Sequence, residues 1–155
     1  MKHLALTLLL SLLTLPALVL PALAEVTHRP ASAELINSGI PVIDIRTEQE
    51  WRQTGVVAGA IPITFFDARG RYDAQAFLQQ LEQQVDKDQP IALICRTGNR
   101  TRAVSQFLSE QGYQVINMEG GIMKMLREGY QPVSYNQRVA ELNATDSCTP
   151  GPMGC

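Results

Sequence analysis

The amino-acid sequence predicts an α/β fold, a doubly wound parallel sheet with helices on both faces. Segments with the pattern of strands alternate with segments with the pattern of helices, and short loops join them. Residues 91–95 (IALIC) are a continuous apolar run, which is typical of a central parallel strand covered on both faces. Ligands of such sheets bind beyond the carboxyl ends of the strands, so we expect the functional site beside Cys95.

Residues 1–24 have the three parts of a secretory signal peptide. Lys2 precedes a long leucine-rich run, and the segment ends in small residues up to Ala24. An uncleaved membrane anchor is the alternative, because the run is nearly long enough to span a bilayer. Pro16 and Pro21 would disturb such a helix. We therefore expect cleavage after Ala24 and export, with a periplasmic location and no membrane contact once the signal is removed.

The rest of the chain is long enough for one ordinary domain. We expect a folded domain over residues 25–134 and a C-terminal tail over 135–155, where the alternation of strands and helices fades. The 155-residue chain has 13 basic and 15 acidic side chains, a formal net charge of -2. This balance argues against nucleic acid as a partner, because domains that bind nucleic acid are usually basic.

Five candidate elements precede the central strand. They are a helix over residues 32–39, a strand over 40–46, a helix over 47–55, a short strand over 60–64 and a helix over 74–85. Ser32 is a plausible N-cap of the first helix, and Thr47 with Glu50 has the pattern of a capping box. Pro62 restricts its strand to an edge or an irregular position. The helix over 74–85 has apolar residues on one face, namely Phe77, Leu78, Leu81 and Val85.

Three further elements follow the central strand. They are a helix over 100–112, a strand over 113–117 and a last short helix over 122–129. Gly112 is expected to end the first of these helices, and Gly120 with Gly121 makes the turn into the last one.

The segment CRTGNR, residues 95–100, has to turn sharply between the central strand and the following helix. Gly98 can supply the positive φ that such a turn needs. Successive N–H groups then point inward as an anion nest, and the helix dipole adds positive potential. A cysteine at the rim of this nest has a stabilised thiolate, so we expect a lowered pKa at Cys95. The alternative is that Cys95 is only a small buried apolar residue at a strand end.

The cysteine count bears on the same residue. The chain has three cysteines, Cys95, Cys148 and Cys155. An oxidising compartment favours disulfides, and an odd number leaves one thiol unpaired. Cys148 and Cys155 lie close together in the tail, so we expect a disulfide between them and a free Cys95. Relay thiols that exchange with a partner are the alternative for the two tail cysteines.

Metal or histidine chemistry has little support in the sequence. The chain has two histidines, His3 in the leader and His28, which we expect on the surface. The cysteines and histidines do not follow the spacing of a zinc site, so we expect neither a metal nor a cofactor. Activation of the Cys95 thiol is therefore left to backbone N–H groups and to the arginines near it. Their local positive charge predicts a small anionic ligand.

At this point the sequence resembles a known family. With a loop of the form C-R-x-G-x-R at residues 95–100, it looks like a single-domain rhodanese, a sulfurtransferase domain. The resemblance covers roughly residues 30–130 and extends to further segments, namely VIDIR (42–46), Glu50 with Trp51, GVVAGAIPI (55–63) and GYQVINMEGG (112–121). The order of these pieces together with the loop is highly specific.

The resemblance implies a persulfide mechanism. The Cys95 thiolate would take a sulfane sulfur from a donor such as thiosulfate and pass it to a thiophilic acceptor, cyanide or a thiol. It implies Cys95 as the catalytic residue and a substrate-binding loop made of Arg96, Thr97, Gly98, Asn99 and Arg100. Arg100 should close the loop, and Arg96 is placed to attract the sulfonate end of the donor. The alternative is a non-catalytic rhodanese-fold binding module that recognises an anion or a protein partner.

Loop length separates this reading from the related phosphatases that share the fold. Those enzymes use a loop one residue longer, C-x5-R, because a phosphate needs a wider cradle. Here the arginine falls at position 100 and Thr101 follows it, which gives C-x4-R. The resemblance therefore favours sulfur transfer over phosphate hydrolysis.

For three groups of residues outside the loop, we expect structural roles more than catalytic ones. Asp44 and Arg46 match the D-x-R of the family, and we expect a buried ion pair that organises the strand end. The segment 55–63 departs from the family pattern G-H-I-P-G-A-x-N-I, with Val56, Ala58 and Pro62 at the changed positions, which affects local loop shape more than chemistry. The remaining apolar residues can belong either to a rim of the site or to the core, and they are Phe65, Phe66 and Met123.

Overall fold

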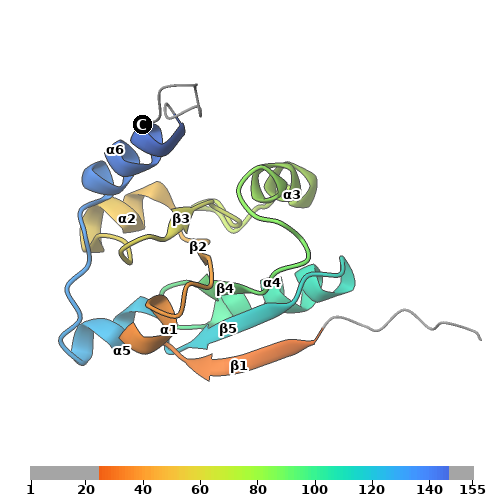
Figure 1. Ribbon diagram of the computed structural model, residues 1–155, viewed down its shortest axis with the longest axis horizontal. Coiled ribbons are helices and arrows are strands. Elements are labelled where there is room, and N and C mark those ends of the chain that lie inside the picture. The colour runs from red at the N-terminus through yellow and green to blue at the C-terminus, as the bar shows by residue number, and fades with distance from the viewer. Residues whose placement is uncertain (1–24, 147–155) are drawn as a thin grey trace, which may run out of the picture.

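The computed structural model of the protein describes residues 25–146 (Figure 1). The expected signal peptide, residues 1–24, lies outside the described residues, as do Cys148 and Cys155. The expectations about export and about the tail cysteines therefore stay predictions. Within the described part of the chain, no helix is both long enough and apolar enough to cross a membrane.

A sheet of five parallel strands forms the centre of the molecule, in the order β1-β5-β4-β2-β3. The strands are β1 (Val26–Pro30), β2 (Val42–Asp44), β3 (Ile61–Pro62), β4 (Ile91–Ile94) and β5 (Val115–Glu119). The helices are α1 (Ala33–Ile36), α2 (Glu48–Thr54), α3 (Ala74–Glu82), α4 (Asn99–Glu110), α5 (Gly121–Arg127) and α6 (Tyr135–Asp146). The predicted fold class is confirmed.

Strand β4 explains why the apolar run over 91–95 is continuous, since its two faces enter two different cores. Ile91 and Leu93 belong to a buried cluster that includes residues of α3 and α4, namely Phe77, Leu81, Val104 and Leu108. Ala92 and Ile94 belong to a second cluster, with residues of α1 and α5, namely Leu35, Ile122 and Met125. Helices therefore cover both faces of the sheet, and β4 lies between β5 and β2.

Local sequence signals place several of the element boundaries. Ser32 Oγ accepts from the Leu35 N–H at 3.3 Å, so it caps α1 as expected. The Thr47–Glu50 capping box at the start of α2 is present in both directions, at 3.3 Å and 3.1 Å. Pro62 lies in β3, which is one of the two edge strands of the sheet. Since an edge strand leaves one row of backbone groups unpaired, the missing N–H of proline is tolerated there.

Two elements were not predicted from the sequence. Strand β1 was missed because VTHRP lacks a clear alternation of polar and apolar residues. It is a strand because it pairs in parallel with β5. The second is α6, which occupies residues 135–146 of the segment that we expected to be a tail without a core. The Tyr135 ring packs on Trp51 of α2 with 5.3 Å between centroids. The Arg138 guanidinium donates to the carbonyls of Gly59 and Ala60 at 3.0 Å and 2.6 Å.

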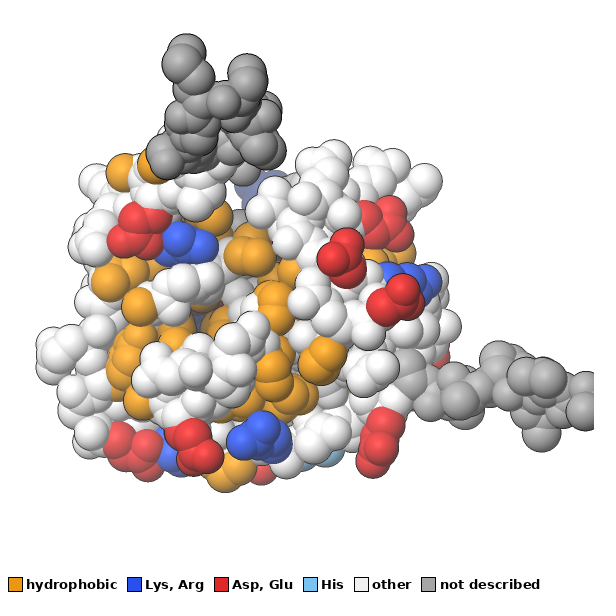
Figure 2. Space-filling view, viewed as in Figure 1, with side chains coloured by type: hydrophobic (Ala, Val, Ile, Leu, Met, Phe, Trp, Pro, Cys, Tyr) orange, Lys and Arg blue, Asp and Glu red, His pale blue; other side chains and the backbone are white. Residues whose placement is uncertain are grey.

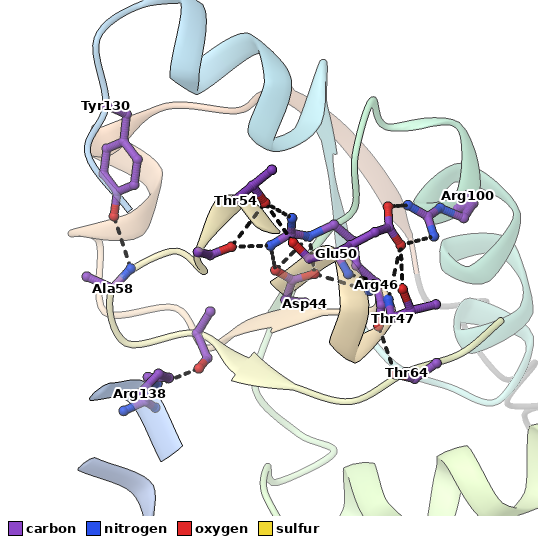
Figure 3. Close-up of polar contacts among 12 residues, drawn as sticks. Asp44, Arg46, Thr47, Glu50, Thr54, Ala58, Thr64, Arg100, Tyr130 and Arg138 are labelled. Atoms are coloured by element: carbon purple, nitrogen blue, oxygen red, sulfur yellow. Dashed lines mark hydrogen bonds and ion pairs between the residues drawn. The ribbon is translucent and has the colours of Figure 1, made fainter. Parts of the chain in front are cut away.

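Helix α6 therefore adds a layer over α2 and the loop that follows it. Nearby, the Ala58 N–H donates to the Tyr130 hydroxyl at 3.0 Å, which fixes the same loop from the chain segment before α6 (Figure 3). In the space-filling view, hydrophobic side chains gather in the middle of the face shown, between the part with α2 and α6 and the part with α1 and α5 (Figure 2).

A buried ion pair joins the end of β2 to the end of α2. Asp44 and Arg46 are almost fully buried, and the Arg46 guanidinium donates to the Asp44 carboxylate at 2.6 Å to 3.0 Å. The same guanidinium donates to Thr54 Oγ1 at 2.6 Å and to the Gly55 carbonyl at 2.8 Å (Figure 3). The expectation of a buried, structural pair is confirmed. Because each charge is desolvated and hydrogen-bonded, the pair holds α2 in a fixed position beside the sheet.

Candidate active site

The loop between β4 and α4 folds back on the side chain of Cys95. Gly98 has φ of 90°, the left-handed conformation that glycine adopts without strain, and α4 begins at Asn99. As a result the Gly98 N–H points inward and donates to Cys95 Sγ at 3.2 Å. Cys95 is buried, with 1% of its surface exposed. The expected nest of backbone donors around the thiol is present.

Thr101 is a second partner of the thiol, and the sequence reasoning missed it. Its Oγ1 lies 3.6 Å from Cys95 Sγ and donates to the Gly98 carbonyl at 3.0 Å. The hydroxyl oxygen can therefore accept the S–H proton while Cys95 is a thiol. Once Cys95 is a thiolate, the same hydroxyl can turn and donate to sulfur. The available signal was the position of a hydroxyl residue in the first turn of the helix after the loop.

These contacts lower the pKa of the Cys95 thiol. Burial acts in the opposite direction, because it raises the pKa by removing the thiolate from water. Hydrogen bonds from the Thr101 N–H and hydroxyl outweigh this effect, together with those from the N–H groups of Thr97 and Gly98. A lowered pKa of the Cys95 thiol is what the sequence predicted. The lowered pKa favours the thiolate of Cys95, which is the form of cysteine that acts as a nucleophile.

Helix α5 packs against the other side of the loop at Gly121. The N–H groups of Ile122 and Met123 donate to the carbonyls of Cys95 and Arg96 at 3.0 Å and 3.1 Å. A Cβ atom at Gly121 would lie 2.7 Å from the Arg96 carbonyl carbon, which is too close for any side chain. The glycine pair was expected only as a turn. It also lets the start of α5 satisfy the backbone carbonyls of the loop.

Arg100 lies in the loop's last position and is held by Glu50 of α2. The two guanidinium nitrogens donate to the two carboxylate oxygens at 2.9 Å and 2.6 Å (Figure 3). Burial would raise the pKa of Glu50, but the hydrogen bonds from Arg100 and from the Thr47 N–H hold it at about 2. The hydrogen bonds to Glu50 raise the pKa of Arg100 in turn. Since the same carboxylate accepts from the Thr47 N–H, one side chain links the start of α2 to the loop.

The other loop residues differ in their surroundings. Arg96, Thr97 and Asn99 are exposed, while Gly98 is buried. A pocket of about 380 Å³ opens at the loop, and we call it the anion pocket because two loop arginines line it. Its lining residues are Thr47, Glu50, Asp67, Ala68, Arg96, Thr97 and Arg100. Asn99 is not among them and begins α4 instead.

The structure brings no metal-binding group to this loop. Among residues 25–146, no three or more His, Cys, Asp or Glu side chains are grouped so that they could hold a metal ion. His28 lies on β1, where its Nδ1 is 3.0 Å from the Asn117 amide nitrogen, and 42% of its side chain is exposed. The expectation of a surface histidine is confirmed.

Comparison with known proteins identifies the family. The family model of the Rhodanese-like domain matches residues 28–128, so the chain belongs to this family. YtwF of Bacillus subtilis, named as a candidate sulfurtransferase, is 32% identical over 82 residues, which are 53% of this chain and 69% of that protein. The rhodanese domain-containing protein CG4456 of Drosophila melanogaster is 32% identical over 75 residues, 46% of this chain and 68% of that protein.

A solved structure shows the same fold. The crystal structure of a rhodanese-related protein from Thermoplasma volcanium superimposes with a TM-score of 0.54 and 28% identity, over 69% of this chain and 97% of that chain. The family and its sulfurtransferase-type relatives agree with the resemblance seen in the sequence.

Thr101 provides the first test of the site. We predict that Thr101→Val shifts the midpoint of the pH dependence of Cys95 alkylation upward, because the thiolate loses a hydroxyl donor. Thr101→Ser keeps the hydroxyl and is the matched control, with a midpoint close to that of the wild type. The measurement is the iodoacetamide reaction rate as a function of pH. An unchanged midpoint in Thr101→Val would contradict a role for the hydroxyl.

Glu50 provides the second test, through stability. Its pKa in the folded protein, about 2, is lower than the ordinary value of 4.5, so its contribution to stability is present above the ordinary value and is lost as the pH falls toward 2. We predict that Glu50→Gln is less stable than the wild type at about pH 7 and that the difference shrinks by about pH 3. Urea unfolding at both pH values measures it.

Glu48→Gln is the matched control for this measurement, since it removes an exposed carboxylate from the same helix. A difference between wild type and Glu50→Gln that stays constant over this pH range would show that the carboxylate does not titrate as described.

Proposed function

We propose that this protein is a sulfurtransferase that carries a sulfane sulfur as a persulfide on Cys95. The observation that supports it most strongly is the Cys95 thiol inside a ring of N–H and hydroxyl donors, with a lowered pKa. Such a site both forms a thiolate nucleophile and can hold a second, negatively charged sulfur next to it. Membership of the rhodanese-like family supports the same reaction class.

The first half-reaction loads the sulfur. The Cys95 thiolate attacks the outer sulfur of thiosulfate, a new S–S bond forms, and the old S–S bond breaks with its electron pair leaving on sulfite. The charge at the start is carried by the thiolate and the donor, and at the end by the persulfide and sulfite. Arg96 is exposed at the anion pocket and suits the sulfonate end of the donor.

The second half-reaction discharges the sulfur. Cyanide or a thiolate attacks the outer sulfur of the persulfide, and the electron pair of the broken S–S bond returns to Cys95 Sγ. The backbone donors of the loop are already in place for the returning thiolate. The protein is then ready for another donor.

The length of the loop favours sulfur over phosphate. Four residues separate Cys95 from Arg100, and the N–H of Gly98 already contacts Sγ itself. Both terminal nitrogens of the Arg100 guanidinium donate to the Glu50 carboxylate. These contacts support a ligand as small as a single additional sulfur atom.

Mass spectrometry of the intact protein tests the proposal. After incubation with thiosulfate, we predict a gain of one sulfur atom that cyanide removes and that never forms in Cys95→Ser. Sulfite should be released in equal amount to the sulfur gained. No gain with thiosulfate or with other sulfane donors would contradict the proposal and would favour a rhodanese-fold binding module for an anion or a protein partner.

We also propose that the protein is exported, with a periplasmic location in a bacterial cell. The support is the pattern of residues 1–24, a lysine followed by a leucine-rich run and a small-residue end at Ala24. Expression of the whole chain with subsequent cell fractionation tests this. We predict a mature N-terminus at Glu25 in the exported fraction, whereas an intact N-terminus in the cytoplasm would contradict it.

A further inference from the structure

A pocket beside α3 differs in chemistry from the anion pocket. It measures about 490 Å³ and lies between α3 and the chain segment before that helix, residues 64–73. The buried rings of Phe65 and Phe77 belong to its lining and meet edge to face, with 4.9 Å between centroids. We call it the aromatic pocket. Among the described residues, Asp67 alone lines both this pocket and the anion pocket.

Tyr72 forms an exposed wall of the aromatic pocket. It is 62% exposed, and it is the only large hydrophobic side chain of residues 25–146 that is exposed. Its ring stacks on Phe65 with 5.2 Å between centroids, and Phe66 lies against it at 5.5 Å. Since the rings of Phe65 and Phe66 are themselves only 4.8 Å apart, they hold the Tyr72 ring from one side. The other side of an already ordered ring is therefore open to a ligand.

The charge of the aromatic pocket is negative because of Asp73. Asp67 accepts from Arg71 Nε at 2.7 Å, so the charges of these two side chains offset each other. Asp73 Oδ1 caps α3 by accepting from the Ala76 N–H at 3.0 Å. Its other oxygen has no hydrogen-bond or ion-pair partner among the described residues. An open aromatic ring and a free carboxylate oxygen in one pocket suit a flat cation.

Two other side chains of the pocket can bind a peptide backbone. Arg71 is 72% exposed, and its two terminal guanidinium nitrogens have no partner in the described part of the chain. They can donate to peptide carbonyls. The exposed Gln80 donates its amide N–H to the Ala76 carbonyl at 3.4 Å, which leaves its amide oxygen to accept from a peptide N–H. The walls of the pocket therefore match a ligand that has a cationic side chain and peptide groups.

We propose that the aromatic pocket binds an arginine side chain on an exposed segment of a partner protein. The guanidinium would stack on the open side of Tyr72 and donate to the free oxygen of Asp73, with its methylene groups against Ala76 and Phe77. Arginine fits better than lysine because its guanidinium is planar and stacks on aromatic rings. A protein fits better than a small molecule, because small molecules usually bind in sites that enclose them and the walls here are exposed.

A partner in this position would lie beside the reactive loop without filling the anion pocket. Asp67 borders both pockets, while none of residues 95–100 lines the aromatic pocket. No covalent bond is made or broken in this binding. The inference therefore goes beyond the proposed function and does not depend on it, and a protein that failed to transfer sulfur would still be expected to bind the arginine.

Titration of the purified protein with a short peptide, followed by NMR, tests the inference. The peptide is an acetylated and amidated tripeptide with arginine between two glycines. We expect shift changes of the backbone amides centred on residues 64–80. Matched peptides with citrulline, which has no charge, or with lysine, which is not planar, should bind more weakly. Binding of the arginine peptide should weaken between about 20 mM and about 500 mM NaCl, because salt screens exposed charges.

Variants separate the charge from the ring. Asp73→Asn removes the charge and keeps α3 capped, because asparagine is as good an N-cap as aspartate. We expect it to bind the arginine peptide about fivefold more weakly. Tyr72→Leu should have a similar effect, about fivefold, through the loss of the ring, whereas Tyr72→Phe keeps the ring and the affinity. Glu82→Gln changes an acidic residue of the same helix outside the pocket and is the matched control.

The spectrum of each free variant reports that it is folded, so each result decides. Equal binding of the arginine and citrulline peptides would overturn the inference, as would wild-type affinity in both Asp73→Asn and Tyr72→Leu. Absence of shift changes at residues 64–80 up to about 10 mM peptide would overturn it as well. Agmatine is a free guanidinium compound without a peptide group. If it binds at least as tightly as the arginine peptide, the occupant is a small molecule and the proposal of a protein partner is wrong.

Discussion

The hydrogen bond from the Gly98 N–H to Cys95 Sγ is the contact on which the rest of the site depends. It requires a chain that leaves β4, reverses within three residues through a left-handed glycine, and enters α4 at once. A side chain at position 98 would disfavour that backbone conformation and would also lie 3.0 Å from the Gly120 N atom. With the turn in place, donors that would otherwise face solvent surround a buried sulfur atom. The low pKa of the thiol follows from this geometry and not from a histidine base.

Elements far from the loop in sequence hold this turn in position. The start of α5 binds two carbonyls of the loop, and the missing side chain at Gly121 allows the close approach. On the opposite side, Glu50 grips Arg100, and α2 is itself held by the buried pair of Asp44 and Arg46. Helix α6 packs on α2 through Tyr135 and Trp51. The reactive loop therefore depends on two helices whose own positions are fixed by burial and hydrogen bonding.

The parts of the fold that could be predicted from the sequence were those with local signals. The apolar run of β4, the capping box at Thr47 and the glycine at position 98 each act within a few residues. The pair of Glu50 and Arg100 joins positions 50 residues apart, so Glu50 was interpreted only as a helix cap although it does both. Helix α6 and strand β1 have weak patterns of their own and gain order from long-range packing. For the same reason, the sequence left the role of Met123 open between core and rim. Only the structure shows that Met123 lines a pocket together with Gln53 and Thr54 of α2.

We propose that the loop of residues 95–100 holds one extra sulfur atom on Cys95. A crystal structure of the thiosulfate-treated protein tests this most directly. We predict one sulfur atom bonded to Cys95 Sγ, lying within hydrogen-bond distance of loop N–H groups, with the loop backbone unchanged from the arrangement described above. An unmodified Cys95 after treatment, or a sulfur atom that points away from the N–H groups of the loop, would contradict the account.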